Sequence, residues 1–302
     1  MEPNTVVRVS EPTSVPGQSL ALKATERRLG AVLVHAGRLQ PQDVEHILLL
    51  QRQKGLRFGD AGKEVGLLTQ ADIEFALARQ FDHPYLQRGE SKVSEEVVAA
   101  YDPFSPQVEA LRAVRGQLML RWLDQEPGGK ALAVISASRK EGRSFIAANL
   151  AVVFAQLGAR TVLIDADLRQ SCQHRLFGLD NRAGLSAVLS GRAAASEALE
   201  RVSHLPNLSV LPAGALPPSP QDLLGRPMFA QLLRQLAAHV DLILLDCPPV
   251  AQTADAQTIA VRAGAALIVV RKDSSRLWRV QGVSDSVTHA KCTIVGAVLN
   301  DF

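Results

Sequence analysis

The stretch with the clearest chemical potential is residues 131–144, ALAVISASRKEGRS, an apolar run followed by a short polar loop. Residues 145–151 favour a helix that is apolar on one side, so the order is strand, loop, helix. That order is the setting of a phosphate-binding loop, which turns backbone N–H groups and a helix N-terminus toward an anion. The usual pattern, G-x-x-x-x-G-K-[ST], is met except that Ala137 replaces the first glycine and Arg143 the lysine. Taken alone, the segment is equally compatible with an ordinary turn between a strand and a helix.

Two later apolar runs end in carboxylates. Residues 161–164 lead into Asp165-Ala-Asp167-Leu-Arg169, and residues 242–245 lead into Asp246. A carboxylate at the C-terminal end of a parallel strand faces the crevice in which α/β sheets bind ligands. Magnesium takes one or two such carboxylates together with phosphate oxygens. The loop and the three acids together therefore predict a magnesium–nucleotide site, whereas each acid alone would indicate a helix cap or a solvated turn.

Composition excludes several other classes of protein. The 302 residues are 47% hydrophobic and 21% charged, which is typical of a globular chain with one sizeable domain and a small one. A net charge of +3 gives no indication of nucleic-acid binding, so no nucleic-acid partner is expected. The three cysteines form no C-x-x-C pair, which favours a reducing cytoplasm. No apolar run approaches the ~18 residues of a membrane span, and the N-terminus lacks the apolar core of a signal peptide.

The N-terminal part divides into a tail and a repeat. Residues 1–25 mix proline, serine, threonine and valine without a period, which predicts a disordered tail. Residues 26–85 contain two copies of one pattern, each predicted to be a short helix, a glycine turn and an amphipathic helix. The equivalent positions are 29 apart: Gly30 and Gly59, Gly37 and Gly66, Val44 and Ile73, Gln51 and Gln80.

This repeat resembles the N-terminal domain of type II secretion and type IV pilus assembly ATPases. Some members of that family bind cyclic di-GMP through the paired motifs. Arg28 matches the arginine that opens the first motif, whereas Arg57-Phe58 departs from the second. A helical docking module is the favoured interpretation of residues 26–85, and binding of the second messenger is the alternative.

Residues 86–104 are polar and are predicted to be a linker that begins to order near Val98. In the helical pattern that follows, Glu109, Arg112 and Arg115 lie three residues apart and therefore share one helix face. Such a face is either a solvated charged stripe or an interface, because arginine suits bidentate pairing with a partner's carboxylate.

From residue 131 onward, apolar strands and helices alternate. This alternation predicts an α/β fold, a phosphate-loop NTPase domain over 105–302, with a mainly parallel sheet covered by helices on both faces and preceded by the small helical domain. The strands are predicted near 131–136, 161–165, 208–211, 241–246, 266–270 and 294–299. The helices are predicted near 143–157, 184–190, 220–238, 253–263 and 276–289.

These residues resemble the bacterial tyrosine kinases that control capsule and exopolysaccharide synthesis, in particular the EpsG-type chain-length-determinant kinases. The resemblance covers residues 105–302. It rests on Gly142-Arg143-Ser144, on the motif from Asp165 to Arg169, and on Asp246-Cys-Pro-Pro249. The stretches FGLDNRAGLS, residues 177–186, and LPAG, residues 211–214, are also similar to the family's. The motif E-x-x-R-x-x-R, which the family uses for ring assembly, falls on Glu109, Arg112 and Arg115.

The resemblance implies a set of roles for the site. ATP phosphates would lie in the loop, Mg²⁺ would be held by Ser144, Asp165 and Asp246, and catalysis would use Arg143, Asp165, Asp167 and Asp246. Either Asp165 or Asp167 would accept the proton of an attacking tyrosine hydroxyl or orient a metal-bound water. The nucleotide-binding residues would be Ala137, Ser138, Arg139, Lys140, Glu141, Gly142, Arg143, Ser144, Phe145 and Asn300.

The partners implied by the resemblance are further copies of the chain and a membrane chain-length determinant, a polysaccharide co-polymerase. The protein would then be cytoplasmic and peripheral to the inner membrane through that partner. Two features depart from the family: Arg143 stands in place of a lysine, and no tyrosine-rich tail follows Phe302. Three functions stay open, namely an active kinase, a catalytically weak nucleotide-binding regulator, and a partitioning-type ATPase.

Overall fold

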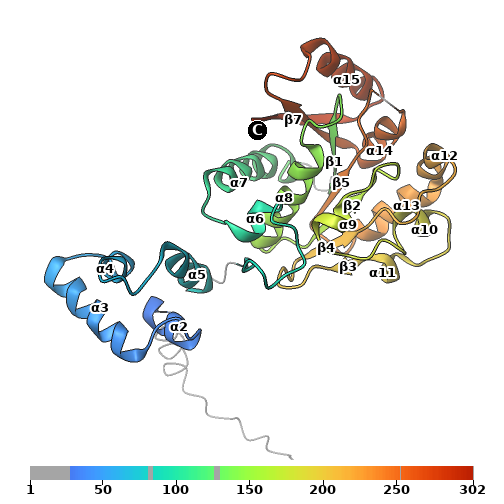
Figure 1. Ribbon diagram of the computed structural model, residues 1–302. Coiled ribbons are helices and arrows are strands. Elements are labelled where there is room, and N and C mark those ends of the chain that lie inside the picture. The colour runs from blue at the N-terminus through green and yellow to red at the C-terminus, as the bar shows by residue number, and fades with distance from the viewer. Residues whose placement is uncertain (1–27, 81–83, 126–129, 252, 302) are drawn as a thin grey trace, which may run out of the picture. The chain divides into compact units, whose positions relative to one another are not determined.

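The computed structural model describes residues 28–80, 84–125, 130–251 and 253–301, so the tail predicted at 1–25 lies outside it. The chain forms two compact units, Met1–His83 and Pro84–Phe302. Within the described ranges, no helix is long and apolar enough to cross a membrane. Figure 1 shows the helices of the small unit and the sheet of the large one.

The small unit is built from the predicted repeat. Its helices are α2 (Leu29–His35), α3 (Pro41–Lys54), α4 (Phe58–Glu64) and α5 (Gln70–Gln80). Helix α2 packs against α5, and α3 packs against α4. A Cβ atom on Gly30 would lie 2.9 Å from Val44, and one on Gly59 would lie 2.9 Å from Ile73. The repeated glycines thus allow each short helix to approach its amphipathic helix closely.

The large unit contains a seven-stranded sheet in the order β3-β4-β2-β5-β1-β6-β7. Each pair of neighbouring strands is parallel, except that β3 and β4 are antiparallel. The strands are β1 (Ala131–Ser136), β2 (Thr161–Asp165), β3 (Glu200–Arg201), β4 (Leu208–Leu211), β5 (Leu242–Asp246), β6 (Ala265–Arg271) and β7 (Thr293–Asn300). The six predicted strands are confirmed. The two-residue β3 was not predicted, since it is too short to show a period.

Helices cover both faces of this sheet (Figure 1). One face packs on α6 (Val98–Tyr101), α7 (Pro106–Leu118), its π-helical extension η1 (Met119–Leu123), and α8 (Arg143–Gln156). The other packs on α10 (Leu185–Leu189), α11 (Ala195–Ala198), α12 (Pro220–Gly225), α13 (Pro227–Ala237), α14 (Asp255–Ala263) and α15 (Leu277–His289). The short helix α9 (Gln173–Leu176) follows β2. The single helix predicted at 220–238 is wrong, because Pro227 favours an extended Arg226 and starts a new helix.

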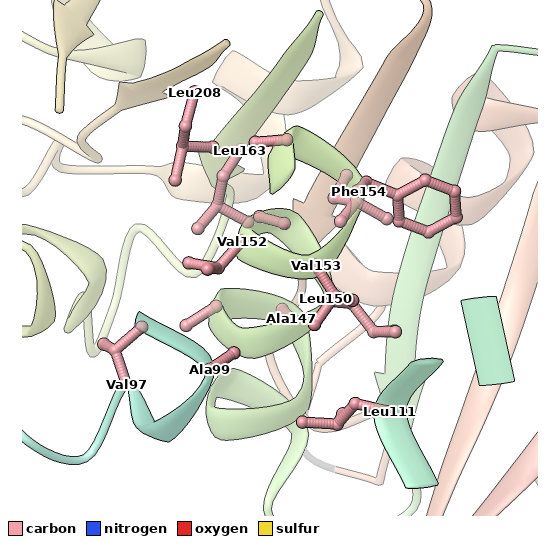
Figure 2. Close-up of a cluster of buried hydrophobic side chains, with 14 of the residues drawn as sticks. Val97, Ala99, Leu111, Ala147, Leu150, Val152, Val153, Phe154, Leu163 and Leu208 are labelled. Carbon is pink, nitrogen blue, oxygen red and sulfur yellow. The ribbon is translucent and has the colours of Figure 1, made fainter. Parts of the chain in front are cut away.

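The segment predicted to be a linker, residues 86–104, packs into the core of the large unit. Leu86, Val93, Val97 and Tyr101 are buried in it, together with the inner sides of α7 and α8. Figure 2 shows Val97 and Ala99 lying against α8. Most of its charged side chains are exposed, which is why the segment resembled a linker, whereas most of its apolar side chains are buried.

Two of the motifs that carried the resemblance contact each other through the backbone. A Cβ atom on Gly184 would lie 2.3 Å from the carbonyl oxygen of Pro212 and 2.4 Å from the nitrogen of Gly214. The amides of Leu185 and Ser186 donate to Pro212 and Ala213, at 2.7 and 2.9 Å. These motifs therefore join α10 to the end of β4 and have a structural role.

Candidate nucleotide site

The predicted phosphate loop connects β1 to α8, whose N-terminus opens at the C-terminal edge of the sheet. Gly142 caps the helix with φ of 88°, and Lys140 has φ of 62°, so the loop turns sharply before the helix begins. The first N–H groups of an α-helix have no partner within the helix, which makes this end a favourable position for an anion. The structure thus brings residues 137–145 into the predicted arrangement.

Neighbouring segments hold the loop in place. Glu141 is buried, and its carboxylate accepts a hydrogen bond from the amide of Ser138 at 2.7 Å and another from the hydroxyl of Ser275. Its carbonyl accepts from the Asn300 side chain at 3.2 Å, and that of Lys140 from Arg271 at 3.2 Å. Asn300, one of the predicted nucleotide-binding residues, therefore lies beside the loop and stabilises it.

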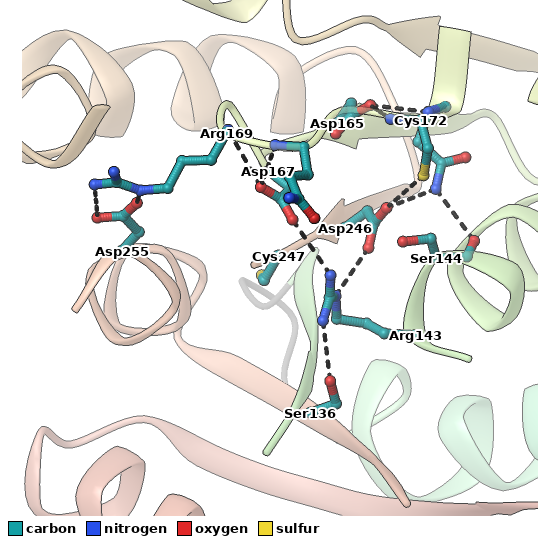
Figure 3. Close-up of polar contacts among 12 residues, drawn as sticks. Ser136, Arg143, Ser144, Asp165, Asp167, Arg169, Cys172, Asp246, Cys247 and Asp255 are labelled. Atoms are coloured by element: carbon teal, nitrogen blue, oxygen red, sulfur yellow. Dashed lines mark hydrogen bonds and ion pairs between the residues drawn. The ribbon is translucent and has the colours of Figure 1, made fainter. Parts of the chain in front are cut away.

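The three predicted acids come together at the same edge of the sheet (Figure 3). Asp165 and Asp246 are direct neighbours in the register of β2 and β5. Asp165 and Asp246 are fully buried, and Asp167 is 4% exposed. Burial of several carboxylates side by side is costly unless they are protonated or paired with a cation.

Arg143 supplies such a cation. Its Nε donates to Asp246 Oδ1 at 3.2 Å, its Nη2 to Asp167 Oδ2 at 3.4 Å, and its Nη1 to the hydroxyl of Ser136 at 3.0 Å. Only 9% of the residue is exposed. The guanidinium therefore lies among the acids, at the base of the loop, as Figure 3 shows.

Asp165 differs from the other two acids. Its Oδ2 accepts the amides of Cys172 and Gln173, both at 2.9 Å, while its Oδ1 is buried without a partner in the structure. Burial, and next the charge of Asp246, raise the pKa of Asp165 to about 8. Burial also raises the pKa of Asp167, although Arg143 opposes this. Burial beside a second carboxylate therefore favours the protonated form of Asp165.

Gln173 is a site residue that the sequence did not reveal. It is fully buried at the start of α9, and its side-chain amide donates to Asp246 Oδ2 at 2.7 Å and to the carbonyl of Ser144 at 3.1 Å. Cys172 lies beside it, with Sγ 3.8 Å from Asp246 Oδ2, and burial raises the pKa of its thiol to about 12. Neither residue belongs to a local pattern, so no signal in the sequence marks them.

The donor set fits a metal that arrives with phosphate. No group of three or more His, Cys, Asp or Glu side chains among the described residues could hold a metal ion alone. Ser144 and Asp246, however, lie at the helix N-terminus and the adjoining strand end, where phosphate oxygens can complete the coordination of Mg²⁺. The unpartnered Oδ1 of Asp165 is a further oxygen at this position.

A groove of about 590 Å³ opens beside the phosphate loop. One wall is formed by α15 and the other by the loop and the residues that follow β5. Arg279 donates to the hydroxyl of Ser138 at 3.2 Å, so α15 and the loop are connected. The residues that line the groove are Ala137, Ser138, Arg139, Val250, Ala251, Trp278, Arg279, Gly282, Val283 and Ser286.

Glu109, Arg112 and Arg115, which are predicted to mediate self-association, lie on α7. In the structure they make contacts within the chain. Arg115 donates to the carbonyl of Val153 on α8 at 2.6 Å. Arg112 pairs with Glu109 one turn away. Both arginines are partly buried, whereas the Glu109 side chain is 63% exposed. The carboxylate is therefore the member of the motif most open to another chain.

Comparison with known proteins agrees with this architecture. The ParA family model, described as NUBPL iron-transfer P-loop NTPase, matches residues 129–301. The tyrosine-protein kinase YwqD of Bacillus subtilis is 32% identical over 70% of this chain and 87% of its own. The putative tyrosine-protein kinase EpsB of Ralstonia solanacearum is 32% identical over 87% of this chain, which spans only 32% of that relative's length. The kinase domain of the Escherichia coli tyrosine kinase ETK superposes with a TM-score of 0.66 at 31% identity, covering 73% of this chain and 85% of that one.

The fold, the loop and the matched residues define a ParA-type P-loop NTPase. Within that class, relatives of similar length that share 31–32% of their sequence with this chain are tyrosine kinases. The chain therefore belongs to the bacterial tyrosine-protein kinase family. The fold class predicted from the sequence is thereby confirmed.

Proposed function

We propose that this chain is an ATP-dependent protein tyrosine kinase that regulates the polymerisation, chain length and export of an exopolysaccharide. The observation that carries the proposal is the convergence of Asp165, Asp167 and Asp246 behind the loop that ends in Arg143 and Ser144. Family membership supports the same reaction. The catalytically weak regulator is the second candidate, and the arginine in the loop favours it.

In this proposal each residue of the site has a separate role. The loop amides and the N-terminus of α8 hold the phosphates, and Arg143 balances their charge. Asp167 is better suited than Asp165 to accept the tyrosine proton, because Asp165 is fully buried and its raised pKa favours the protonated form. Gln173, at the start of α9, donates to Asp246 and to the carbonyl of Ser144, and so holds the Asp246 carboxylate in position. Bound Mg²⁺ would neutralise charge that develops on the transferred phosphoryl group.

Nucleotide binding gives the first prediction. We expect micromolar affinity for ADP or ATP, on the order of −8 kcal/mol, that depends on Mg²⁺. Asp246→Ala should abolish the magnesium dependence, since it removes the carboxylate best placed to bind the ion. Asp241→Ala, at the opposite end of β5 and paired with Arg160 on the surface, is the matched control and should leave binding unchanged. Calorimetry with and without Mg²⁺ checks this, and absence of nucleotide binding in the unaltered protein would contradict the proposed site.

The arginine in the loop gives the second prediction. A lysine ammonium can follow a moving phosphoryl group as a compact charge, whereas a guanidinium keeps a fixed fork. We expect Arg143→Lys to raise the rate of phosphotransfer or ATP hydrolysis several-fold while nucleotide affinity changes by less than about tenfold, or ~1.4 kcal/mol. Steady-state kinetics of the two proteins measure this. A lower kcat in the lysine variant would mean that the loop is adapted to arginine.

The acceptor tyrosine is restricted by the fold. Of the two tyrosines in the sequence, Tyr101 is 6% exposed and donates to the carbonyl of Val93 in the core. Tyr85 is only partly buried. We therefore assign phosphotransfer to Tyr85 or to a tyrosine of another protein.

We further propose that the partner is a membrane chain-length determinant, which would place this chain at the cytoplasmic side of the inner membrane. Membership of the bacterial tyrosine-protein kinase family supports this proposal. The small helical unit is proposed as a docking module, since α3 exposes Leu48 and Leu49 at 39% and 57%. Cyclic di-GMP is the alternative ligand there, and calorimetry with that nucleotide tests it.

Self-association gives the third prediction. We expect the chain to form a homo-oligomer through α7 that salt weakens, because exposed ion pairs are screened over ~8–10 Å. Arg112→Ala combined with Arg115→Ala should shift it to monomer, and so should Glu109→Ala, which touches no intrachain contact of Arg115. Sedimentation at several concentrations measures this. Identical profiles for all three proteins would show that this helix face is only solvated surface.

One experiment separates the active kinase from the weak regulator. Phosphotyrosine blotting is performed after incubation with Mg-ATP, with and without the cytoplasmic segment of the partner. A signal that requires Asp167 and Mg²⁺ supports the kinase. Nucleotide binding without any phosphotyrosine, on this chain or on the partner, supports the regulator.

A further inference from the structure

The Arg143 side chain does not extend freely into the loop in which a phosphate would bind. Its three nitrogens each have a partner below the loop, on two carboxylates and one hydroxyl. The two carboxylates belong to different strand ends, Asp167 after β2 and Asp246 on β5. The guanidinium therefore bridges Asp167 and Asp246, and Asp246 is one of the residues expected to hold a divalent cation.

The charges explain why this arrangement is stable. Asp246 is fully buried and Asp167 almost so, and each ion pair with Arg143 is shielded from water. A buried carboxylate without a counter-charge destabilises the fold strongly, whereas a paired one does not. A lysine could place one point charge there, but only the planar fork of arginine reaches both acids and Ser136 at once.

We infer that Arg143 is an internal counter-ion: its guanidinium neutralises Asp167 and Asp246 and occupies the position beside Asp246 that a divalent cation would otherwise take. The inference rests on the proposed nucleotide site. The metal gains access to Asp246 when the phosphates of a nucleotide draw the guanidinium away from the acids. Nucleotide and metal then bind together, and the metal alone binds poorly.

The test measures metal binding without nucleotide. Thermal unfolding of the nucleotide-free protein is followed over a MgCl₂ titration, with KCl at equal ionic strength as the reference. We expect the melting temperature of the unaltered protein to be independent of Mg²⁺. We expect Arg143→Gln to melt several degrees lower in chelator and to recover with millimolar Mg²⁺, with an apparent affinity at least ~10-fold tighter than that of the unaltered protein.

Arg169→Gln is the matched control. Arg169 belongs to the same motif as Asp167 and pairs with the buried Asp255 at 2.7 Å, outside the acid cluster. This variant should also melt lower, but Mg²⁺ should not restore it. Adding Asp246→Asn to Arg143→Gln should abolish the recovery. If Arg143→Gln does not fold, Arg143→Lys replaces it and should show a smaller Mg²⁺ response of the same sign.

Two results would overturn the inference. One is stabilisation of the unaltered protein by Mg²⁺ alone as strong as that of the variant. The other is no Mg²⁺ response in either Arg143 variant. The proposed function is tested apart from this, by calorimetry with Mg-ADP. Recovery of Arg143→Gln by Mg²⁺ supports Arg143 as an internal counter-ion even if the unaltered protein binds no nucleotide. Absence of nucleotide binding would contradict the proposed kinase function but not the counter-ion role.

Discussion

Asp165→Asn is expected to stabilise the nucleotide-free protein at neutral pH by on the order of 2–4 kcal/mol. The reason is the position of Asp165, buried beside Asp246 and without a cation of its own. Its pKa rises from 3.8 to about 8 on folding, so the folded protein keeps a proton that the unfolded chain releases. An asparagine can accept the same amide hydrogen bonds from Cys172 and Gln173 without this penalty.

The direction of the pH dependence follows from the raised pKa. Below about pH 4 the carboxyl group is protonated in both states, and its contribution to stability is fully present. Between pH 4 and about 8 the unfolded chain ionises while the folded protein does not, so the free energy of unfolding falls as pH rises. Above about pH 8 both states are ionised and the loss levels off.

Urea unfolding of the unaltered protein and Asp165→Asn between pH 5 and about 8 measures this difference. The gap between the two proteins should widen as pH rises. Asp285→Asn, which alters an exposed acid on α15, is the control and should change stability by less than ~0.5 kcal/mol at every pH. Parallel curves for Asp165→Asn and the unaltered protein would show that Asp165 is ionised in the folded site.

The architecture of the large unit was accessible from sequence because its six longer strands are short, mostly apolar runs that end in acids or in a loop. The position of Asp165 beside Asp246 follows from the same reasoning, since parallel strands end at one edge. The repeat of the small unit was equally visible, and the contacts of Gly30 and Gly59 with their amphipathic helices give it a physical cause.

What the sequence could not reveal depends on packing between distant segments. The direction in which Arg143 points is decided by three partners on β1, β5 and the residues after β2, and no local pattern encodes it. Gln173 escaped notice for the same reason. Residues 86–104 looked like a linker because the segment begins with polar and charged residues. Its contacts with the buried side-chain amides of Asn149 and Gln156 on α8 depend on packing between distant segments.

Those amides give the last prediction, in which Asn149→Ala lowers the free energy of unfolding by about 2–4 kcal/mol. Asn149 is fully buried on α8, the helix that begins at the phosphate loop. Its Oδ1 accepts the amide of Ala99 at 2.9 Å, and its Nδ2 donates to the carbonyl of Glu96 at 3.2 Å. Alanine leaves both backbone groups without these partners inside the protein, which is the costly way to lose a hydrogen bond.

The same substitution should loosen residues 94–101 selectively. Hydrogen exchange at the amide of Ala99 should accelerate more than exchange in the strands of the sheet, because the segment opens locally before the unit unfolds. Asn207→Ala is the control, since Asn207 also donates to α8, at Ala155, but is only partly buried and does not touch the segment. We expect it to cost less than ~1 kcal/mol and to leave exchange at Ala99 unchanged. Equal exchange at Ala99 in both variants would mean that apolar burial of Val97 and Tyr101, rather than Asn149, fixes the segment to the helix that carries the nucleotide loop.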